Sequence, residues 1–143
     1  MKKYYFAYGS NMSQARLESR VGKVVKVGVY NIEGYRLVFN AGVETRCFAN
    51  LMKTGFYKDV VQGVLYEVSD RQLKQLDIFE GAPIFYNRFI EHIGKRNVNV
   101  YIAITPWYTQ QGNIRPEQEY INYCIQGCIE NNMVTTLLQF REI

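Results

Sequence analysis

The stretch Tyr4-Tyr5-Phe6-Ala7-Tyr8-Gly9-Ser10-Asn11 joins an apolar run directly to a glycine and two small polar residues. The apolar run predicts a short strand over about residues 3–8, and the polar residues predict a turn. Such a turn directs several backbone N–H groups at one point, and a helix beginning at Ser10 or Asn11 would add the positive end of its dipole. The stretch therefore predicts a site for a carboxylate or a developing oxyanion, with an ordinary strand-to-helix turn as the simpler alternative.

The length and composition of the chain predict one domain over residues 1–143. Hydrophobic residues make up 48% of the chain, which is enough for a core, and no linker or internal repeat is visible. The apolar run that follows Met1-Lys2-Lys3 is interrupted at Gly9, too early for a signal peptide or a membrane segment. We therefore expect a soluble, cytoplasmic protein with no membrane partner.

Charge and cysteine content argue against several kinds of partner. The net charge of +4 is scattered along the chain, and most of the 12 tyrosines fall at strand or helix positions, so we expect no nucleic-acid binding. The cysteines are Cys47, Cys124 and Cys128, and His92 is the single histidine, which leaves no zinc ligand set. We expect buried, reduced thiols, no metal and no cofactor.

The pattern of apolar residues predicts more strands than helices. Strands are predicted over residues 24–30, 35–40, 46–53, 60–68, 85–93 and 98–105, the last two as a hairpin around Gly94-Lys95-Arg96-Asn97. Helices are predicted over residues 13–20 with Ser13 as a candidate cap, and after Ser69 as a cap through Phe79, with Gly81 and Pro83 ending that helix. A last helix is predicted from Pro116 onwards, with a further short element over residues 134–140. This order predicts an α+β domain, a small mixed, mostly antiparallel β-barrel or half-barrel with two or three flanking helices.

The chain lacks the residues of several common mechanisms. A serine or cysteine nucleophile usually needs a histidine base, and His92 is predicted to be a surface or structural residue of a strand. Gly9 stands alone, so no phosphate-binding glycine motif is present. Asp77 and Glu80 could form a carboxylate pair, but residues three apart on a helix more commonly serve local structure. Acid–base chemistry would therefore fall to a carboxylate, a tyrosine or a lysine.

Glu80 is the strongest candidate for that chemistry. It lies at the end of the second predicted helix, in which Leu73, Leu76 and Phe79 are predicted to face the core. Large neighbours such as Phe79 and Phe85 would desolvate the carboxyl group and raise its pKa toward the range useful for a general base. The negative end of the helix dipole would raise the pKa further. An exposed glutamate at a helix end is the alternative that spacing alone favours.

An ordered set of short blocks resembles the gamma-glutamylcyclotransferase family. The blocks are Tyr5-Phe6-Ala7-Tyr8-Gly9-Ser10-Asn11, Leu76-Asp77-x-x-Glu80-Gly81, Tyr86-x-Arg88, and Pro116-Glu117-Gln118-Glu119-Tyr120 followed by Cys124 and Gly127. Each block is weak alone, but the ordered set is specific and covers nearly the whole chain. The resemblance implies the mixed barrel fold of that family.

The resemblance also implies roles for individual residues. The first block is the family's substrate-binding turn, which carries over to Tyr8, Gly9, Ser10 and Asn11, and the glutamate before the glycine is its catalytic base, here Glu80. Tyr86 and Tyr120 match positions near the family's pocket. The implied reaction cyclises a gamma-glutamyl group to 5-oxoproline and releases an amino acid or amine without a cofactor. Asn11 after Gly-Ser resembles the branch that acts on gamma-glutamyl amino acids.

Two other functions stay open on the sequence. One is a non-catalytic small-molecule binding domain of the same fold, in which Glu80 orients the amine of a ligand. The other is an RNA- or protein-interaction domain that uses a tyrosine-rich surface. A homodimer is also open, with Trp107 and Tyr108 as candidates for an interface or for the wall of the pocket.

Overall fold

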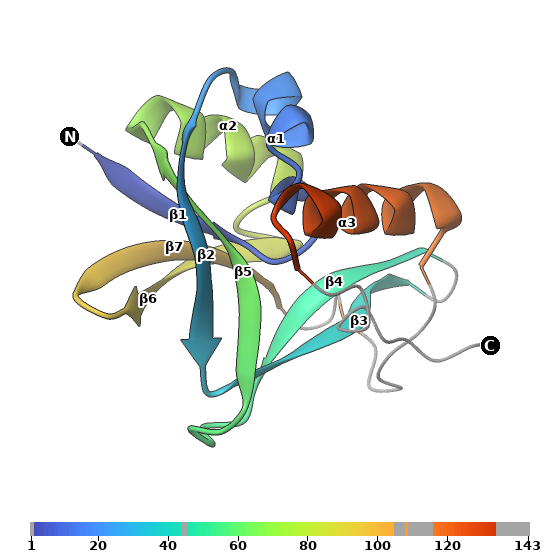
Figure 1. The fold of residues 1–143 in the computed structure, drawn as a ribbon. Helices are drawn as coiled ribbons and strands as arrows, with labels where there is room; N and C mark the ends of the chain where they lie inside the picture. Colours follow the sequence, from blue (N-terminus) through green and yellow to red (C-terminus); the bar gives the residue numbers. More distant parts are fainter. Residues whose placement is uncertain (1, 44–45, 105–107, 109–115, 134–143) are drawn as a thin grey trace.

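The computed structural model describes residues 2–43, 46–104, 108 and 116–133, which form an α+β domain (Figure 1). A five-stranded sheet has the strand order β2-β5-β1-β7-β6, and β3 pairs with β4 in a separate two-stranded sheet. β1 lies antiparallel to β5 and parallel to β7, while the other pairs are antiparallel. The strands are β1 Lys3–Ala7, β2 Val25–Glu33, β3 Tyr35–Val43, β4 Arg46–Lys53, β5 Val60–Val68, β6 Tyr86–Ile93 and β7 Arg96–Ala103.

The first strand, β1, has apolar residues on both faces because it lies in the middle of the sheet with core on either side. Tyr5 and Ala7 point into one cluster of buried side chains, which includes Leu76. Phe6 points into a second cluster, which includes Phe39 of β3. Successive side chains of a strand alternate between its faces, so a strand buried on both faces requires a continuous apolar run. The central position of β1 places the residues that follow it in the interior of the domain.

Three α-helices and one short 3₁₀ helix complete the fold. They are η1 Ser10–Met12, α1 Gln14–Val21, α2 Asp70–Glu80 and α3 Gln118–Glu130. The Ser13 hydroxyl accepts a hydrogen bond from the Arg16 N–H at 3.4 Å, and Ser69 forms a capping box with Gln72. Both serines were predicted as caps, and both predictions are confirmed. α1 and α2 lie side by side in Figure 1, whereas α3 packs against η1.

The structure confirms the predicted fold class but gives an open sheet. Helices and mostly antiparallel strands occur in the predicted order. Among the described residues, β2 and β6 are the two edges of the five-stranded sheet, so the predicted barrel is only a loose description. The periodicity of single strands could not distinguish closure from an open sheet, because closure depends on pairing between strands distant in sequence.

Local boundaries differ from the predictions at several places, and β2 and β3, for example, each extend three residues beyond the predicted ends at residues 30 and 40. The turn between β6 and β7 is Gly94-Lys95 alone, because Arg96 already pairs with Ile93. Pro116 does not open the last helix, which begins at Gln118 after Glu117 as its N-cap. The first helix after β1 is only the short η1, and the α-helix begins four residues further on, at Gln14. The predicted element at 134–140 and Trp107 lie outside the described residues.

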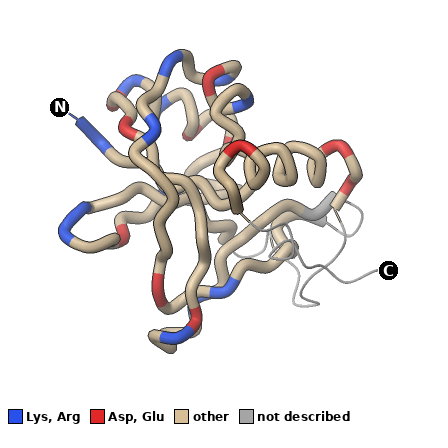
Figure 2. The backbone as a smooth tube through the Cα atoms, in the orientation of Figure 1, with Lys and Arg blue, Asp and Glu red and all other residues tan. Residues whose placement is uncertain are grey.

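The described residues include Cys124, Cys128 and many of the charged side chains, whereas the side chain of Cys47 lies outside them. Figure 2 shows Lys and Arg interspersed with Asp and Glu over the described part of the chain. Cys124 and Cys128 are free and buried. Within the described ranges, no cluster of three or more His, Cys, Asp or Glu could hold a metal ion. None of the helices in those ranges has the length and apolar character needed to span a bilayer.

Candidate functional site

A cavity of about 200 Å³ lies where β1 ends. It brings together predicted site residues from the turn after β1, the end of α2, the start of β6 and α3. Those residues are Tyr8, Gly9, Ser10, Asn11, Glu80, Tyr86 and Tyr120. His92, by contrast, is exposed on β6 and does not line this cavity. The structure therefore places every predicted site residue around one cavity.

The turn after β1 presents unused backbone donors beside the cavity. The N–H groups of Gly9, Ser10 and Asn11 donate to no other group among the described residues. The turn itself is closed by hydrogen bonds from Met12 N–H to Gly9 O (3.1 Å) and from Ser13 N–H to Ser10 O (3.2 Å). Unused N–H groups in the first turn of a helix are suited to an anion or a developing oxyanion.

Gly9 and the residues after it are fixed by close packing. A Cβ atom on Gly9 would lie 2.8 Å from the hydroxyl oxygen of Tyr120 and 3.2 Å from Cβ of Ala49. The carbonyl of Met12 accepts hydrogen bonds from the Tyr66 hydroxyl (2.9 Å) and from Nδ2 of Asn131 (3.1 Å). The turn is therefore closely packed at both ends, an arrangement that favours preorganised donors.

Glu80 reaches the cavity because it lies on the buried face of α2. Leu73, Leu76 and Glu80 have the i, i+3, i+7 spacing of one helical face, and both leucines are buried. Phe79 was predicted to face the core, and this prediction is wrong: its side chain is 55% exposed. The helix ends directly after Glu80 because Gly81 adopts a left-handed conformation (φ 66°) and its N–H bonds back to Ile78 O.

The environment of Glu80 raises the pKa of its carboxyl group to about 7, because burial disfavours the charged form. The guanidinium groups of Arg20 and Arg16 act in the opposite direction, yet the effect of burial is larger. No hydrogen bond or ion pair within the described residues occupies the carboxyl group. A carboxyl group with a pKa near neutrality can both accept and return a proton.

Burial of this carboxyl group should make the folded protein less stable when Glu80 is ionised. The folded-state pKa of about 7 exceeds the ordinary value of 4.5, so the folded state holds the proton more tightly than the unfolded state. Stability is therefore lost as pH rises from about 4.5 to 7. We expect Glu80→Gln to raise the melting temperature by roughly 3–8 °C at pH 8 and much less at pH 5. Thermal melts at both pH values check this, with Glu33→Gln at an exposed position as the control. Equal shifts of the melting temperature at the two pH values would contradict it.

Three tyrosine hydroxyls fix the wall of the cavity. The Tyr86 hydroxyl donates to the carbonyl of Ala49 at 2.6 Å, and the Ala49 N–H donates to the Tyr120 hydroxyl at 3.0 Å. The Tyr8 hydroxyl donates to the carbonyl of Tyr101. Tyr86 and Tyr120 thus hold β4 against the site by its backbone. Their shared contact, Ala49, could not be identified from the sequence because it depends on the position of a separate sheet.

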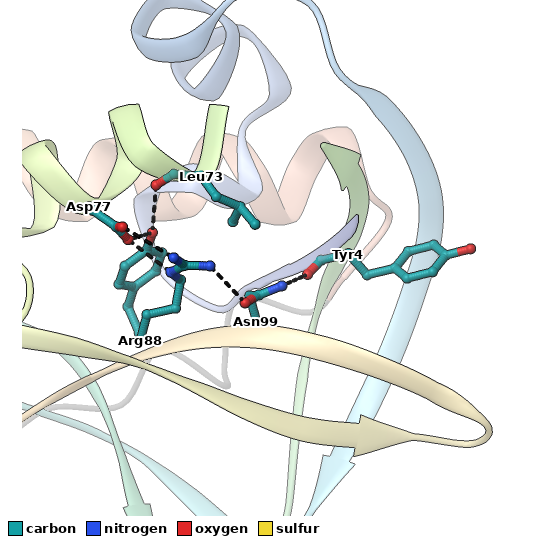
Figure 3. A network of polar contacts seen from close by, with 6 residues as sticks. Tyr4, Leu73, Asp77, Arg88 and Asn99 are labelled. Carbon is teal, nitrogen blue, oxygen red and sulfur yellow. Dashed lines mark hydrogen bonds and ion pairs between the residues drawn. The ribbon is translucent and has the colours of Figure 1, made fainter. Parts of the chain in front are cut away.

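Asp77, in the block that precedes Glu80, has a structural role in the fold. Asp77 forms a two-point ion pair with Arg88, at 2.9 Å (Nε to Oδ1) and 3.2 Å, and accepts the Tyr101 hydroxyl at 2.6 Å. Arg88 also donates to Asn99, which donates to the carbonyl of Tyr4 (Figure 3). This network joins α2 to β6, β7 and β1. Asp77 does not line the cavity with Glu80, so the carboxylate pair considered from the sequence is not formed there.

Several cavity residues were missed by the sequence reasoning. Arg16 and Arg20 line the cavity from α1, and Tyr5 lines it from β1. The Tyr5 hydroxyl accepts a hydrogen bond from Nδ2 of Asn11 at 3.0 Å. The two arginines are four residues apart on the predicted helix, so both lie on one face of it. That spacing could have indicated a basic face on the helix, but the sequence alone does not show that this face lies beside Glu80.

Comparisons with known proteins point to one family. The family model described as gamma-glutamyl cyclotransferase, AIG2-like, matches residues 5–122, a range that contains every predicted site residue. A curated relative, gamma-glutamyl cyclotransferase gliK of Aspergillus fumigatus, is 26% identical over 159 residues. That alignment covers 92% of this chain and 58% of the relative, so the chain spans little more than half of the relative's length.

Solved structures share the fold over almost the whole chain. A structure titled gamma-glutamyl cyclotransferase has a TM-score of 0.77 and 21% identity, covering 100% of this chain and 90% of its own. The human protein titled uncharacterized protein loc79017 has a TM-score of 0.75 and 21% identity, covering 99% of this chain and 89% of its own. The family match covers most of the sequence and includes the cavity. The chain therefore belongs to the gamma-glutamyl cyclotransferase, AIG2-like family.

Proposed function

We propose that this protein is a gamma-glutamylcyclotransferase. It would convert the gamma-glutamyl group of a small gamma-glutamyl amino acid or amine to 5-oxoproline and release the free amino acid or amine. The observation that carries the proposal is a single carboxyl group, Glu80, with a pKa raised to about 7, sharing one cavity with unused backbone N–H donors. Membership of the family supports the same reaction class.

The reaction needs no nucleophile from the protein. The α-amine of the substrate attacks its own γ-carbonyl carbon and closes a five-membered lactam, so the enzyme mainly has to hold the bent conformation. A compact cavity with rigid walls suits that task, because Tyr86 and Tyr120 hold β4 in place beside the turn. The single exposed His92 is then no obstacle to catalysis.

Glu80 would move one proton in each half of the reaction. Its carboxylate takes a proton from the α-ammonium, and the neutral amine then forms the new C–N bond while the carbonyl oxygen becomes an oxyanion. The N–H groups of Gly9, Ser10 and Asn11 would stabilise that oxyanion. Glu80 then returns the proton to the departing nitrogen as the old C–N bond breaks, and the ring nitrogen loses its extra proton to water, which leaves the neutral lactam. The carboxylate is regenerated, and the products are 5-oxoproline and the free amine.

The direct test is the release of 5-oxoproline from gamma-glutamyl-alanine. Purified protein and substrate are incubated at pH 8, and 5-oxoproline and alanine are measured together by liquid chromatography and mass spectrometry. We expect both products in equal amounts, well above the rate of spontaneous cyclisation. A short panel with other leaving groups, including gamma-glutamyl-ethylamine, would identify the class of leaving group that the cavity accepts.

A non-catalytic binding domain of the same fold is the second candidate. In that case Glu80 would hold the ammonium group of a ligand without transferring its proton. Calorimetry would then detect binding of gamma-glutamyl-alanine while no 5-oxoproline forms. This pair of results would reject the cyclotransferase proposal and favour the binding domain.

A further inference from the structure

Two residues that line the cavity each contain a buried polar side-chain atom with no partner among the described residues. These atoms are Nε of Arg16, which is a hydrogen-bond donor, and Oδ1 of Asn11, which is an acceptor. Both atoms are buried, and the Asn11 side chain as a whole is only 4% exposed. A buried polar atom without a partner costs free energy, so such atoms mark places where a ligand can supply the missing bond.

The guanidinium group of Arg16 stacks on an aromatic ring of α3 and lies beside a second arginine. Its guanidinium carbon lies 3.8 Å from the centre of the Tyr123 ring, so the ring covers one face of the planar group. Arg20 lies nearby with its guanidinium 5.1 Å from the centre of the Phe79 ring. Neither arginine makes an ion pair with a described residue. Two positive charges therefore lie near the single half-buried carboxyl group of Glu80. Even with Glu80 ionised, one positive charge is not neutralised, so the cavity favours a ligand with a negative charge.

The electrostatics of Arg16 agree with this geometry. Burial lowers the pKa of its guanidinium group, and the positive charge of Arg20 lowers it further. A bound carboxylate would offset both effects, because it would replace lost hydration and neutralise the repulsion between the two arginines.

We infer that Arg16 is a specificity-determining residue that binds the α-carboxylate of the gamma-glutamyl group, while Oδ1 of Asn11 accepts a hydrogen bond from the α-ammonium. This inference rests on the proposed function and deepens it. The α-carboxylate and the α-ammonium share one carbon atom, so the groups that bind them must be neighbours. Arg16 and Asn11 line the same cavity as Glu80, which would take the proton from that ammonium.

This assignment divides the work of the site. If Arg16 binds the α-carboxylate, the backbone N–H groups of Gly9, Ser10 and Asn11 remain for the oxyanion at the γ-carbon. The site would then bind the α-amino and α-carboxylate groups of the substrate, and the leaving group would not need a carboxylate. An alternative occupant for Arg16 is the carboxylate of a leaving amino acid, and the experiment below separates the two.

The test compares three substrates on the wild type and on Arg16→Gln, with a third protein as the control. The substrates are gamma-glutamyl-alanine, its analogue with an α-carboxamide in place of the α-carboxylate, and gamma-glutamyl-ethylamine, which lacks the leaving-group carboxylate. We expect the wild type to lose about 10- to 100-fold in kcat/KM on the α-carboxamide. Arg16→Gln should lose a similar factor on both α-carboxylate substrates and show almost no further loss on the carboxamide. Arg71→Gln, an exposed change on α2, is the matched control.

Two outcomes would overturn the inference. One is an Arg16→Gln variant that keeps the full preference for the α-carboxylate. The other is a loss found with gamma-glutamyl-alanine but not with gamma-glutamyl-ethylamine, which would assign Arg16 to the leaving group. Because Arg16 also stacks on Tyr123, Arg16→Lys provides the same comparison if Arg16→Gln does not fold, since it retains a charge but loses the donor pair.

Binding measurements separate this inference from the proposed reaction. Calorimetry with gamma-glutamyl-alanine is carried out on Glu80→Gln and on Glu80→Gln with Arg16→Gln. Weaker binding to the double variant supports the inference even if the wild type forms no 5-oxoproline, in which case only the proposed reaction fails. Equal binding to both variants would overturn the inference while product release by the wild type still supports the reaction. A complete absence of binding and turnover would overturn both.

Discussion

Glu80→Gln is expected to lower kcat for 5-oxoproline release by about 100-fold or more, while KM changes only a few-fold. The amide has nearly the shape of the carboxyl group but cannot accept and return a proton, and general acid–base catalysis commonly contributes factors of about 10² to 10⁴. The loss should therefore fall on kcat, because the substrate is still bound. The measurement is steady-state kinetics with gamma-glutamyl-alanine.

The control for this change is Glu33→Gln, the same substitution at an exposed position of β2 outside the cavity. We expect it to retain wild-type kinetics. Glu80→Asp adds a useful comparison, since it keeps a carboxyl group but withdraws it from the substrate by one methylene. A Glu80→Gln variant with wild-type turnover would show that another group moves the proton.

Gly9→Ala is expected to reduce kcat/KM by about 100-fold, because it displaces the turn that carries the backbone donors. The new Cβ would lie 2.8 Å from the Tyr120 hydroxyl oxygen and 3.2 Å from Cβ of Ala49, so the turn, β4 or Tyr120 must shift. Loss of one oxyanion donor, or a shift of about 1 Å in the site, commonly costs about 10²-fold. Kinetics on the folded variant, with circular dichroism as a check of folding, measure the effect.

The hydroxyl of Tyr120 provides a second variant that tests the cause of this loss. Tyr120→Phe removes the oxygen that clashes with the new methyl group, but it also leaves the N–H of Ala49 without its acceptor. We expect Tyr120→Phe alone to be impaired and to recover part of the activity of Gly9→Ala when the two changes are combined. Strictly additive losses would argue against a steric cause.

The sequence was sufficient to predict the elements that are specified locally. The strand predicted over residues 60–68 and the serine caps of α1 and α2 rest on local signals, and each appears in the structure as predicted. The turn after β1 was recognised for a similar reason, since Gly9, Ser10 and Asn11 are adjacent in the chain. Its short 3₁₀ helix was not distinguished from a longer helix, because the two share their first residues.

The buried position of Glu80 was predicted, but partly for the wrong reason. Phe79 was expected to face the core with Leu73 and Leu76, whereas the structure exposes Phe79 and puts Glu80 on the face shared by the two leucines. The helical spacing of these residues contained the correct answer. A hydrophobic pattern alone favours placing the phenylalanine inside, because it assigns no benefit to burying a carboxyl group.

Contacts between distant segments could not be obtained from the sequence. Ala49 receives Tyr86 from β6 and Tyr120 from α3, and this convergence depends on how the two-stranded sheet lies beside the five-stranded one. Arg16 and Arg20 have an informative spacing, yet their position beside Glu80 follows from the packing of α1 on α2. Tertiary packing therefore supplies the charge balance of the cavity, which the local pattern does not contain.

The pH dependence of kcat/KM for 5-oxoproline release from gamma-glutamyl-alanine tests the central claim most directly. This parameter reports ionisations of the free enzyme and free substrate, and the substrate's carboxyl groups titrate far lower, near roughly 3.5. With Glu80 as the base, release should fall on the acid side with a pKa of about 7, and Glu80→Gln should abolish this limb together with most of the rate. Absence of 5-oxoproline, or release whose acid limb is unchanged in Glu80→Gln, would contradict the account.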